Sequence, residues 1–178
     1  YENGNKRFYV IRDRKGRYIG SDKEWFESGY IRKDHNYKDG KKHGLQKDWN
    51  AWIMTNLENY SEGKKYGLFK KWSDYSEGMG YDRGDEGFLY LVENWKDDKK
   101  HGRFLYYDTI SQNLIYERNY KYGQYDGVQK TYYENSQLES EENYIDGRKD
   151  GICKYYDYQG HLESEENYTN GEKDGVQK

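Results

Sequence analysis

The residues best suited to chemistry in this sequence are two histidines, His43 and His101, and the single cysteine, Cys153. The two histidines stand at the same place in two copies of a short segment, "KKHG", as paired metal ligands or catalytic bases would. A third copy between them has Tyr66 at this place, so we interpret both histidines as structural residues near a turn. Cys153 has no recurring histidine beside it, and lone cysteines are usually inert packing residues. We therefore expect no catalytic residue, no cofactor and no metal.

Acidic residues form a second candidate site. The run "ESEEN" occurs at residues 139–143 and again at 163–167, and its identical recurrence would set two acidic patches side by side. We predict that Glu139, Glu141, Glu163 and Glu165 contact a basic protein partner. A solvated sheet face is the alternative reading of the same charges.

A third candidate is the segment "SDYSEGMGYDRGDEGF", residues 73–88, which interrupts an otherwise regular sequence. Long irregular segments inside regular folds tend to carry function. Its acidic residues do not have the spacing of an EF-hand calcium loop. We predict instead that it contacts a protein partner through Asp74, Tyr75, Met79, Tyr81, Asp82, Asp85 and Glu86.

The regularity that this segment interrupts is a repeat of about 24 residues. The nonapeptide "NYKDGKKHG" and its relatives begin at Asn36, Asn59, Asn94, Asn119, Asn143 and Asn167. The longest spacing, between Asn59 and Asn94, is the same unit with an insertion. Fixed-period self-similarity indicates stacked units that bury their faces against neighbouring units.

Within one unit the residue pattern predicts a β-hairpin. In "QLESEENY" (137–144) side chains alternate, with Leu138 and Tyr144 on one face and the glutamates on the other. Gly147 and Gly151 can adopt the positive φ that a hairpin turn requires. "ICKYYDY" (152–158) is the predicted return strand, rich in β-preferring residues.

The predicted fold is therefore all-β: an elongated antiparallel β-hairpin repeat array of about seven units. We expect residues 1–178 to form a single array with one irregular insertion at 73–88. Lysines on the return strands, Lys130, Lys154 and Lys178, are expected to pair with the glutamates across the strands.

Composition and charge limit the functional classes. Apolar residues make up only 33% of the chain but aromatic residues 19%, so we expect a thin core faced by tyrosine. The net charge of −3 does not indicate binding to nucleic acid. Residues 1–50 carry 13 basic and 8 acidic side chains, whereas residues 131–178 carry 5 and 12.

The compartment is predicted only in outline. No run of apolar residues is long enough for a transmembrane segment. We expect a cytoplasmic protein, or a periplasmic or surface protein if a signal peptide has been removed.

The chain resembles the MORN-repeat family, whose units carry a Tyr or Trp, a Gly-Lys/Arg pair and a His-Gly near the turn. "YKDGKKHG" (37–44) and "WKDDKKHG" (95–102) match this pattern, while other copies place Tyr66, Asp126, Asp150 and Asp174 at the histidine position. With these substitutions the repeats look more like the MORN variants common in bacterial proteins. The resemblance implies an elongated all-β hairpin array and no catalytic residues.

From these features we expect a non-enzymatic protein-binding module. The resemblance implies a concrete form, an antitoxin or immunity protein that binds and neutralises a toxin. One alternative is a scaffold that self-associates head to tail, because the two ends differ in charge. Another is a secreted surface protein that binds glycans through its aromatic residues.

Overall fold

The structure is a computed structural model that describes residues 1–51, 53–73 and 87–175. These residues form eighteen β-strands and no helix. They divide into two compact units, which are described separately below: unit 1 is Tyr1–Leu89 with Trp95–Asp98, and unit 2 is Tyr90–Asn94 with Lys99–Lys178. The prediction of an all-β antiparallel hairpin array is confirmed by the strand pairing in both.

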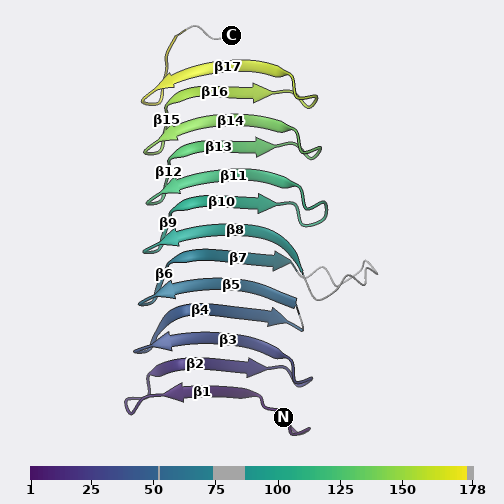
Figure 1. The fold of residues 1–178 in the computed structure, drawn as a ribbon, viewed down its shortest axis with the longest axis vertical. Helices are drawn as coiled ribbons and strands as arrows, with labels where there is room; N and C mark the ends of the chain where they lie inside the picture. The colour runs from purple at the N-terminus through teal and green to yellow at the C-terminus, as the bar shows by residue number, and fades with distance from the viewer. Residues whose placement is uncertain (52, 74–86, 176–178) are drawn as a thin grey trace. The chain divides into compact units, whose positions relative to one another are not determined.

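Unit 1 is an antiparallel meander in which successive strands lie side by side (Figure 1). Its strands are β1 (Phe8–Arg12), β2 (Tyr18–Trp25), β3 (Ile31–Lys38), β4 (Lys41–Asn50), β5 (Ile53–Ser61), β6 (Lys64–Lys65) and β7 (Gly67–Ser73). The short β6 and the longer β7 both pair with β5, so one outgoing strand serves a return strand that is broken in two.

Unit 2 repeats this arrangement more regularly. Its strands are β8 (Phe88–Lys96, of which residues 90–94 belong to this unit), β9 (Lys99–Lys100), β10 (Gly102–Tyr107), β11 (Leu114–Lys121), β12 (Gln124–Tyr125), β13 (Gly127–Tyr132), β14 (Leu138–Ile145), β15 (Arg148–Lys149), β16 (Gly151–Tyr156), β17 (Leu162–Thr169) and β18 (Glu172–Lys173). Each outgoing strand, such as β14, pairs with a short strand, β15, and a longer one, β16.

The tight turn of each hairpin has two residues, both with positive φ. In β11–β12 these are Tyr122 (φ 49°) and Gly123 (φ 95°), which lie between the paired residues Lys121 and Gln124. Positive φ at both central positions defines the type I′ turn, whose twist matches that of the flanking strands. One copy has Asp98 (φ 64°) where the others have glycine.

The second glycine of the repeat serves a different purpose from the one predicted. Gly151 (φ 97°) does not lie in the turn but at the break between β15 and β16, where Asp150 N donates to Asn143 O at 2.9 Å. The side-chain Nδ2 of Asn143 also donates to the backbone carbonyl of Ile152, just beyond this glycine. Asn36, Asn94 and Asn119 make the same contact in their own repeats. The recurring asparagine therefore holds the break in the return strand.

Consecutive hairpins are joined at their turns by backbone hydrogen bonds. In unit 2, Gly147 N donates to Tyr125 O and Gly171 N donates to Lys149 O, both at 2.8 Å. The residue before the second glycine supplies another acceptor, because Asp150 Oδ2 accepts from Asn170 N at 3.0 Å. These contacts fix each turn on the hairpin that precedes it.

The opposite ends of the hairpins are joined by side chains. Tyr133 Oη donates to Tyr156 O, and Asn135 Nδ2 donates to Tyr158 O, both at 2.8 Å in unit 2. In unit 1 the segment "YEN" at the start of the chain does the same, since Tyr1 Oη and Asn3 Nδ2 donate to carbonyls one repeat later. The segments 1–4 and 133–136, which are similar in sequence, therefore have the same structural role.

The buried core is thin, as predicted. One residue of each repeat is almost completely buried, two positions after the second glycine. These residues are Asp22, Gln46 and Phe69 in unit 1 and Phe104, Gln129 and Cys153 in unit 2. The polar members need internal partners, and Gln129 Nε2 donates to the carbonyls of Asn119 and Gly127 while its Oε1 accepts from Asn119 N.

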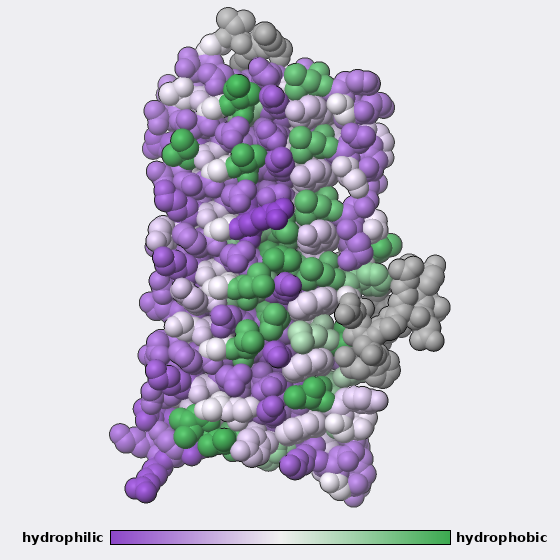
Figure 2. All heavy atoms as spheres, viewed as in Figure 1, coloured by the Kyte–Doolittle hydropathy of each residue, from purple (hydrophilic) through white to green (hydrophobic). Residues whose placement is uncertain are grey.

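The two faces of the sheet in unit 2 differ in chemistry. Because side chains alternate along a strand, Lys130, Glu141, Lys154 and Glu165 share one face, here called the ion-pair face. Lys130 pairs with Glu141 at 2.9 Å and Lys154 with Glu165 at 3.9 Å, which confirms two of the predicted cross-strand pairs. Lys178 lies outside the described residues. In Figure 2 hydrophilic side chains cover most of the visible face, and apolar side chains interrupt them over several strands.

Candidate binding site

The other face of unit 2 carries a continuous set of aromatic rings, here called the aromatic face. It comprises Phe104, Tyr106, Tyr116, Tyr120, Tyr125, Tyr144, Tyr155 and Tyr168. The Tyr120 ring lies 4.7 Å from the Phe104 ring and 4.9 Å from the Tyr125 ring, centroid to centroid. Such ring pairs contribute about 1 kcal/mol each beyond their buried area.

Unit 1 has a smaller version of the same arrangement. Phe69 lies 5.6 Å from Tyr60 and 6.1 Å from Trp95, and the Lys65 ammonium lies 4.3 Å from the Trp95 ring centroid. The aromatic residue that follows the repeat asparagine is therefore a packing position in both units.

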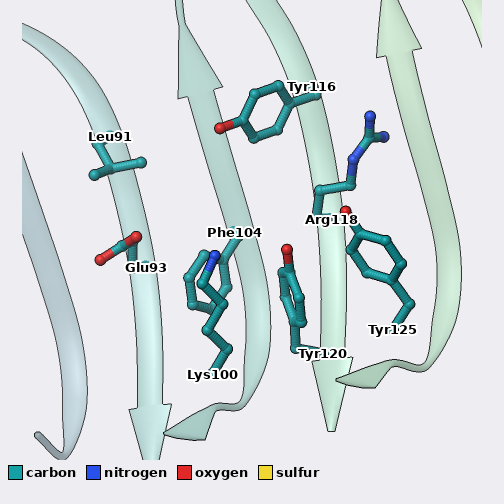
Figure 3. Close-up of a pocket in the computed structure, with 8 residues that line it drawn as sticks. All are labelled: Leu91, Glu93, Lys100, Phe104, Tyr116, Arg118, Tyr120 and Tyr125. Carbon is teal, nitrogen blue, oxygen red and sulfur yellow. The ribbon is translucent and has the colours of Figure 1, made fainter. Parts of the chain in front are cut away.

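The aromatic face of unit 2 is hollowed where β8, β9, β10, β11 and β12 present their side chains (Figure 3). The hollow has a volume of about 280 Å³, enough for one side chain or one small ring. Its lining comprises Leu91, Glu93, Lys100, Phe104, Tyr116, Arg118, Tyr120 and Tyr125.

Two cations contribute to this lining. The Lys100 ammonium lies 4.9 Å from the ring centroids of both Phe104 and Tyr120. The Arg118 guanidinium lies 5.1 Å from the Tyr116 ring and donates to Lys130 O at 2.7 Å and Thr131 Oγ1 at 2.9 Å. Cations over aromatic rings are stabilised by the electron-rich ring face.

The tyrosines of the hollow stay neutral near physiological pH. Burial raises the pKa of Tyr116, and its neighbour Tyr106 raises it further. Burial, together with a hydrogen bond to Tyr125, raises the pKa of Tyr120 well above its usual value. Both phenol groups therefore remain hydroxyls that can donate or accept a hydrogen bond.

Beside the hollow, a cluster of charged groups on the same face is fully paired. Lys149 Nζ lies 2.7 Å from Glu142 Oε1 and donates to Tyr155 Oη at 2.8 Å, and Tyr155 Oη donates to Glu142 Oε1. Burial opposes the charge on Glu142, but these hydrogen bonds hold its pKa below the usual value. Burial is the largest cause that raises the pKa of Tyr155 to about 12. This cluster stabilises the face rather than offering an open site.

The predicted partner-binding residues of the insertion, Asp74, Tyr75, Met79, Tyr81, Asp82, Asp85 and Glu86, lie outside the described residues. Their proposed contact with a partner stays a prediction.

The predicted acidic patch lies on one face of unit 2, as expected from alternation. Glu141 and Glu165 are both aligned with Lys154, and each is paired with a lysine. Glu163 is exposed and lies one repeat from Glu139. Only part of the patch therefore offers unpaired negative charge.

The histidines have the structural role that was predicted, with a specific hydrogen-bonding function. His43 Nδ1 accepts from Glu62 N, and His101 Nδ1 accepts from Tyr122 N, each at 3.4 Å. Each histidine thus bonds to the turn of the next hairpin, where Asp150 uses a carboxylate. An acceptor is what the position requires, which explains the exchange of His for Asp between repeats.

Cys153 is completely buried, and burial raises the pKa of its thiol. Within the described ranges, no three His, Cys, Asp or Glu side chains gather closely enough to hold a metal ion. None of the described residues forms a helix that would cross a membrane.

Sequence reasoning missed Arg118 and Tyr125, which help to line the hollow. A signal for them was present in the repeat. The residue before the asparagine is Glu58, Glu93, Glu142 or Glu166 in four copies but Arg118 in another. Comparison of the chain with protein-family models and with curated proteins gives no match.

Proposed function

We propose that this chain is a non-enzymatic protein-binding module that contacts its partner through the aromatic face of unit 2. The observation that carries this proposal is the hollow, where aromatic rings meet two cations and a carboxylate on one face. Tyrosine, tryptophan and arginine are the residues that most often dominate the energy of protein interfaces.

Two further features support a binding role. The ionisable groups next to the hollow, Glu142 and Lys149, are held in a closed network of hydrogen bonds. The face is also rigidly framed, because each turn is bonded to the preceding hairpin. A preformed surface loses little side-chain entropy on binding, so the same contacts give higher affinity.

The resemblance to bacterial MORN variants leads to the most concrete form of the proposal, an antitoxin or immunity protein that covers a toxin. The protein partner would then be encoded beside this chain in the genome. Its contact surface would include the hollow and its surrounding tyrosines.

The test is co-expression with the protein encoded by the neighbouring gene, followed by titration calorimetry of the purified complex. We expect Tyr116→Ala to weaken binding about tenfold or more, because a ring that lines the hollow is lost. The matched control is Ile152→Ala, a partly exposed side chain of the opposite face. A complex weakened by Ile152→Ala and untouched by Tyr116→Ala would contradict the proposed surface.

A further inference from the structure

The hollow lies where one repeat departs from the others at two positions. The residue before the repeat asparagine is glutamate in Glu58, Glu93, Glu142 and Glu166, whereas it is Arg118 here. The second residue of the short return strand is lysine in Lys42, Lys65, Lys100, Lys149 and Lys173, whereas it is Tyr125 here. Both Arg118 and Tyr125 line the hollow.

Regular repeats show what these two positions normally do. Lys149 forms an ion pair with Glu142, and Lys173 forms one with Glu166, both at 2.7 Å. Lys42 of unit 1 reaches the glutamate of the following hairpin, Glu58, at 3.9 Å. A lysine of this row is therefore normally next to a carboxylate of its own or the next hairpin.

In the divergent repeat that carboxylate is missing. The hairpin that follows Lys100 presents Arg118 where a glutamate would stand. Among the described residues, no carboxylate lies within ion-pair distance of the Lys100 ammonium or the Arg118 guanidinium. Lys100 rests over two aromatic rings instead, and Arg118 bonds to a carbonyl and a hydroxyl.

The charge of the lining follows directly. Lys100 and Arg118 contribute two positive charges and Glu93 one negative charge, so the hollow carries an excess of one positive charge. It lies in a chain with a net charge of −3, so the excess is local. Arg118 has five N–H donors and uses Nη1 and Nη2 on neighbouring groups, which leaves further donors for a ligand.

We propose that the hollow receives a carboxylate side chain, aspartate or glutamate, from the partner protein, in place of the glutamate that other repeats supply themselves. This inference rests on the proposed function and names the chemistry of the anchor. The carboxylate accepts hydrogen bonds from Lys100 or Arg118 and from the neutral hydroxyls of Tyr116 and Tyr120. Leu91 and Phe104 contact apolar atoms that flank it. Charge-assisted hydrogen bonds of this kind are about twice as strong as neutral ones.

The experiment is an NMR titration of the full-length, isotope-labelled chain with two matched peptides. The probes are acetyl-Tyr-Glu-Tyr-amide and acetyl-Tyr-Gln-Tyr-amide, which differ only in the charged group. We expect saturable shifts at Lys100, Arg118, Tyr116 and Tyr120 with the glutamate peptide. The glutamine peptide should bind about tenfold more weakly, as expected when a charge-assisted hydrogen bond is lost.

Two variants make the result specific. Arg118→Glu together with Tyr125→Lys restores the pair seen in Glu142 and Lys149, so it should fold and abolish the preference for the glutamate peptide. Arg118→Gln removes only the charge and should reduce the preference. Glu163→Gln, on the other face of the same unit, is the matched control and should leave both affinities unchanged.

Equal binding of the two peptides, or no binding of either, would overturn the carboxylate site. So would a preference that persists in the restored double variant. These outcomes would leave the protein-binding proposal standing if Tyr116→Ala still weakens the complex with the neighbouring gene's product. Loss of that dependence would overturn the proposed surface, whatever the peptides do.

Discussion

At the scale of single residues, the repeated spelling of the chain reflects hydrogen bonds more than apolar packing. The asparagine that opens each nonapeptide caps the break in the return strand, as Asn143 does for Ile152. The position before the second glycine supplies an acceptor to the next turn, through His101 or Asp150. A thin sheet has few buried apolar groups, so these polar contacts make up a large share of its specific stability.

The asparagine contact gives the first prediction. Asn143→Ala removes the bond to the Ile152 carbonyl, and we expect it to lower the free energy of unfolding by about 1 kcal/mol. Urea denaturation followed by circular dichroism measures the change. Asn56→Ala is the control, because the Asn56 side chain makes no hydrogen bond within the described residues. Equal losses in the two variants would show that the cap is unimportant.

A second prediction concerns pH. Asp157 accepts backbone hydrogen bonds from His161 and Gln159 in the loop after β16, and these lower its pKa from the usual value. A carboxyl whose folded pKa lies below the unfolded one stabilises the fold above the unfolded pKa, about 3.9. That stability is lost as the pH falls through the folded pKa.

Asp157→Asn should therefore lose stability relative to the wild-type protein near neutral pH, and the difference should shrink below about pH 4. Urea midpoints measured across this range test the point, with Glu163→Gln as the control for an exposed acid. A difference that stays constant with pH would rule out the charge on Asp157 as its cause.

At the scale of the hairpin, turn geometry fixes the register. Gly123 has a φ of 95°, and an added Cβ at this position would meet no atom within 4 Å. Any cost of substitution there comes from backbone conformation alone, since L-residues with a side chain avoid this region.

We expect Gly123→Ala to destabilise unit 2 by about 1 kcal/mol or more. Gly123→Asn should cost less, because asparagine tolerates positive φ better than alanine does. Thermal unfolding of the two variants side by side provides the comparison. Equal midpoints for alanine and asparagine would mean that φ is not the cause.

The elements were largely predictable, and the side-chain partners were not. Alternation and glycine spacing predicted a strand over 137–144, close to β14 (Leu138–Ile145). Alternation could not reveal the break at Gly151, nor the shift of register by which Tyr132 faces Leu138 rather than Glu139. Such breaks decide which lysine meets which glutamate across the strands, so the charge excess around Lys100 and Arg118 was visible only in three dimensions.

At the scale of the whole molecule, the separation of chemistry between two faces is the main functional feature. In unit 2 the ion-pair face neutralises itself through Lys130 with Glu141 and Lys154 with Glu165. The aromatic face keeps two cations without carboxylate partners among the described residues. A partner protein therefore gains more from the aromatic face, where desolvated rings and unpaired cations are available.

The most direct test of this account is site-specific photo-crosslinking in the co-expressed complex. A benzophenone amino acid replaces Tyr116 or Tyr144 on the aromatic face, and Ile152 or Glu163 on the opposite face, in separate variants. The account predicts crosslinks to the partner from Tyr116 and Tyr144 and none from Ile152 or Glu163. Crosslinks confined to Ile152 and Glu163 would contradict it.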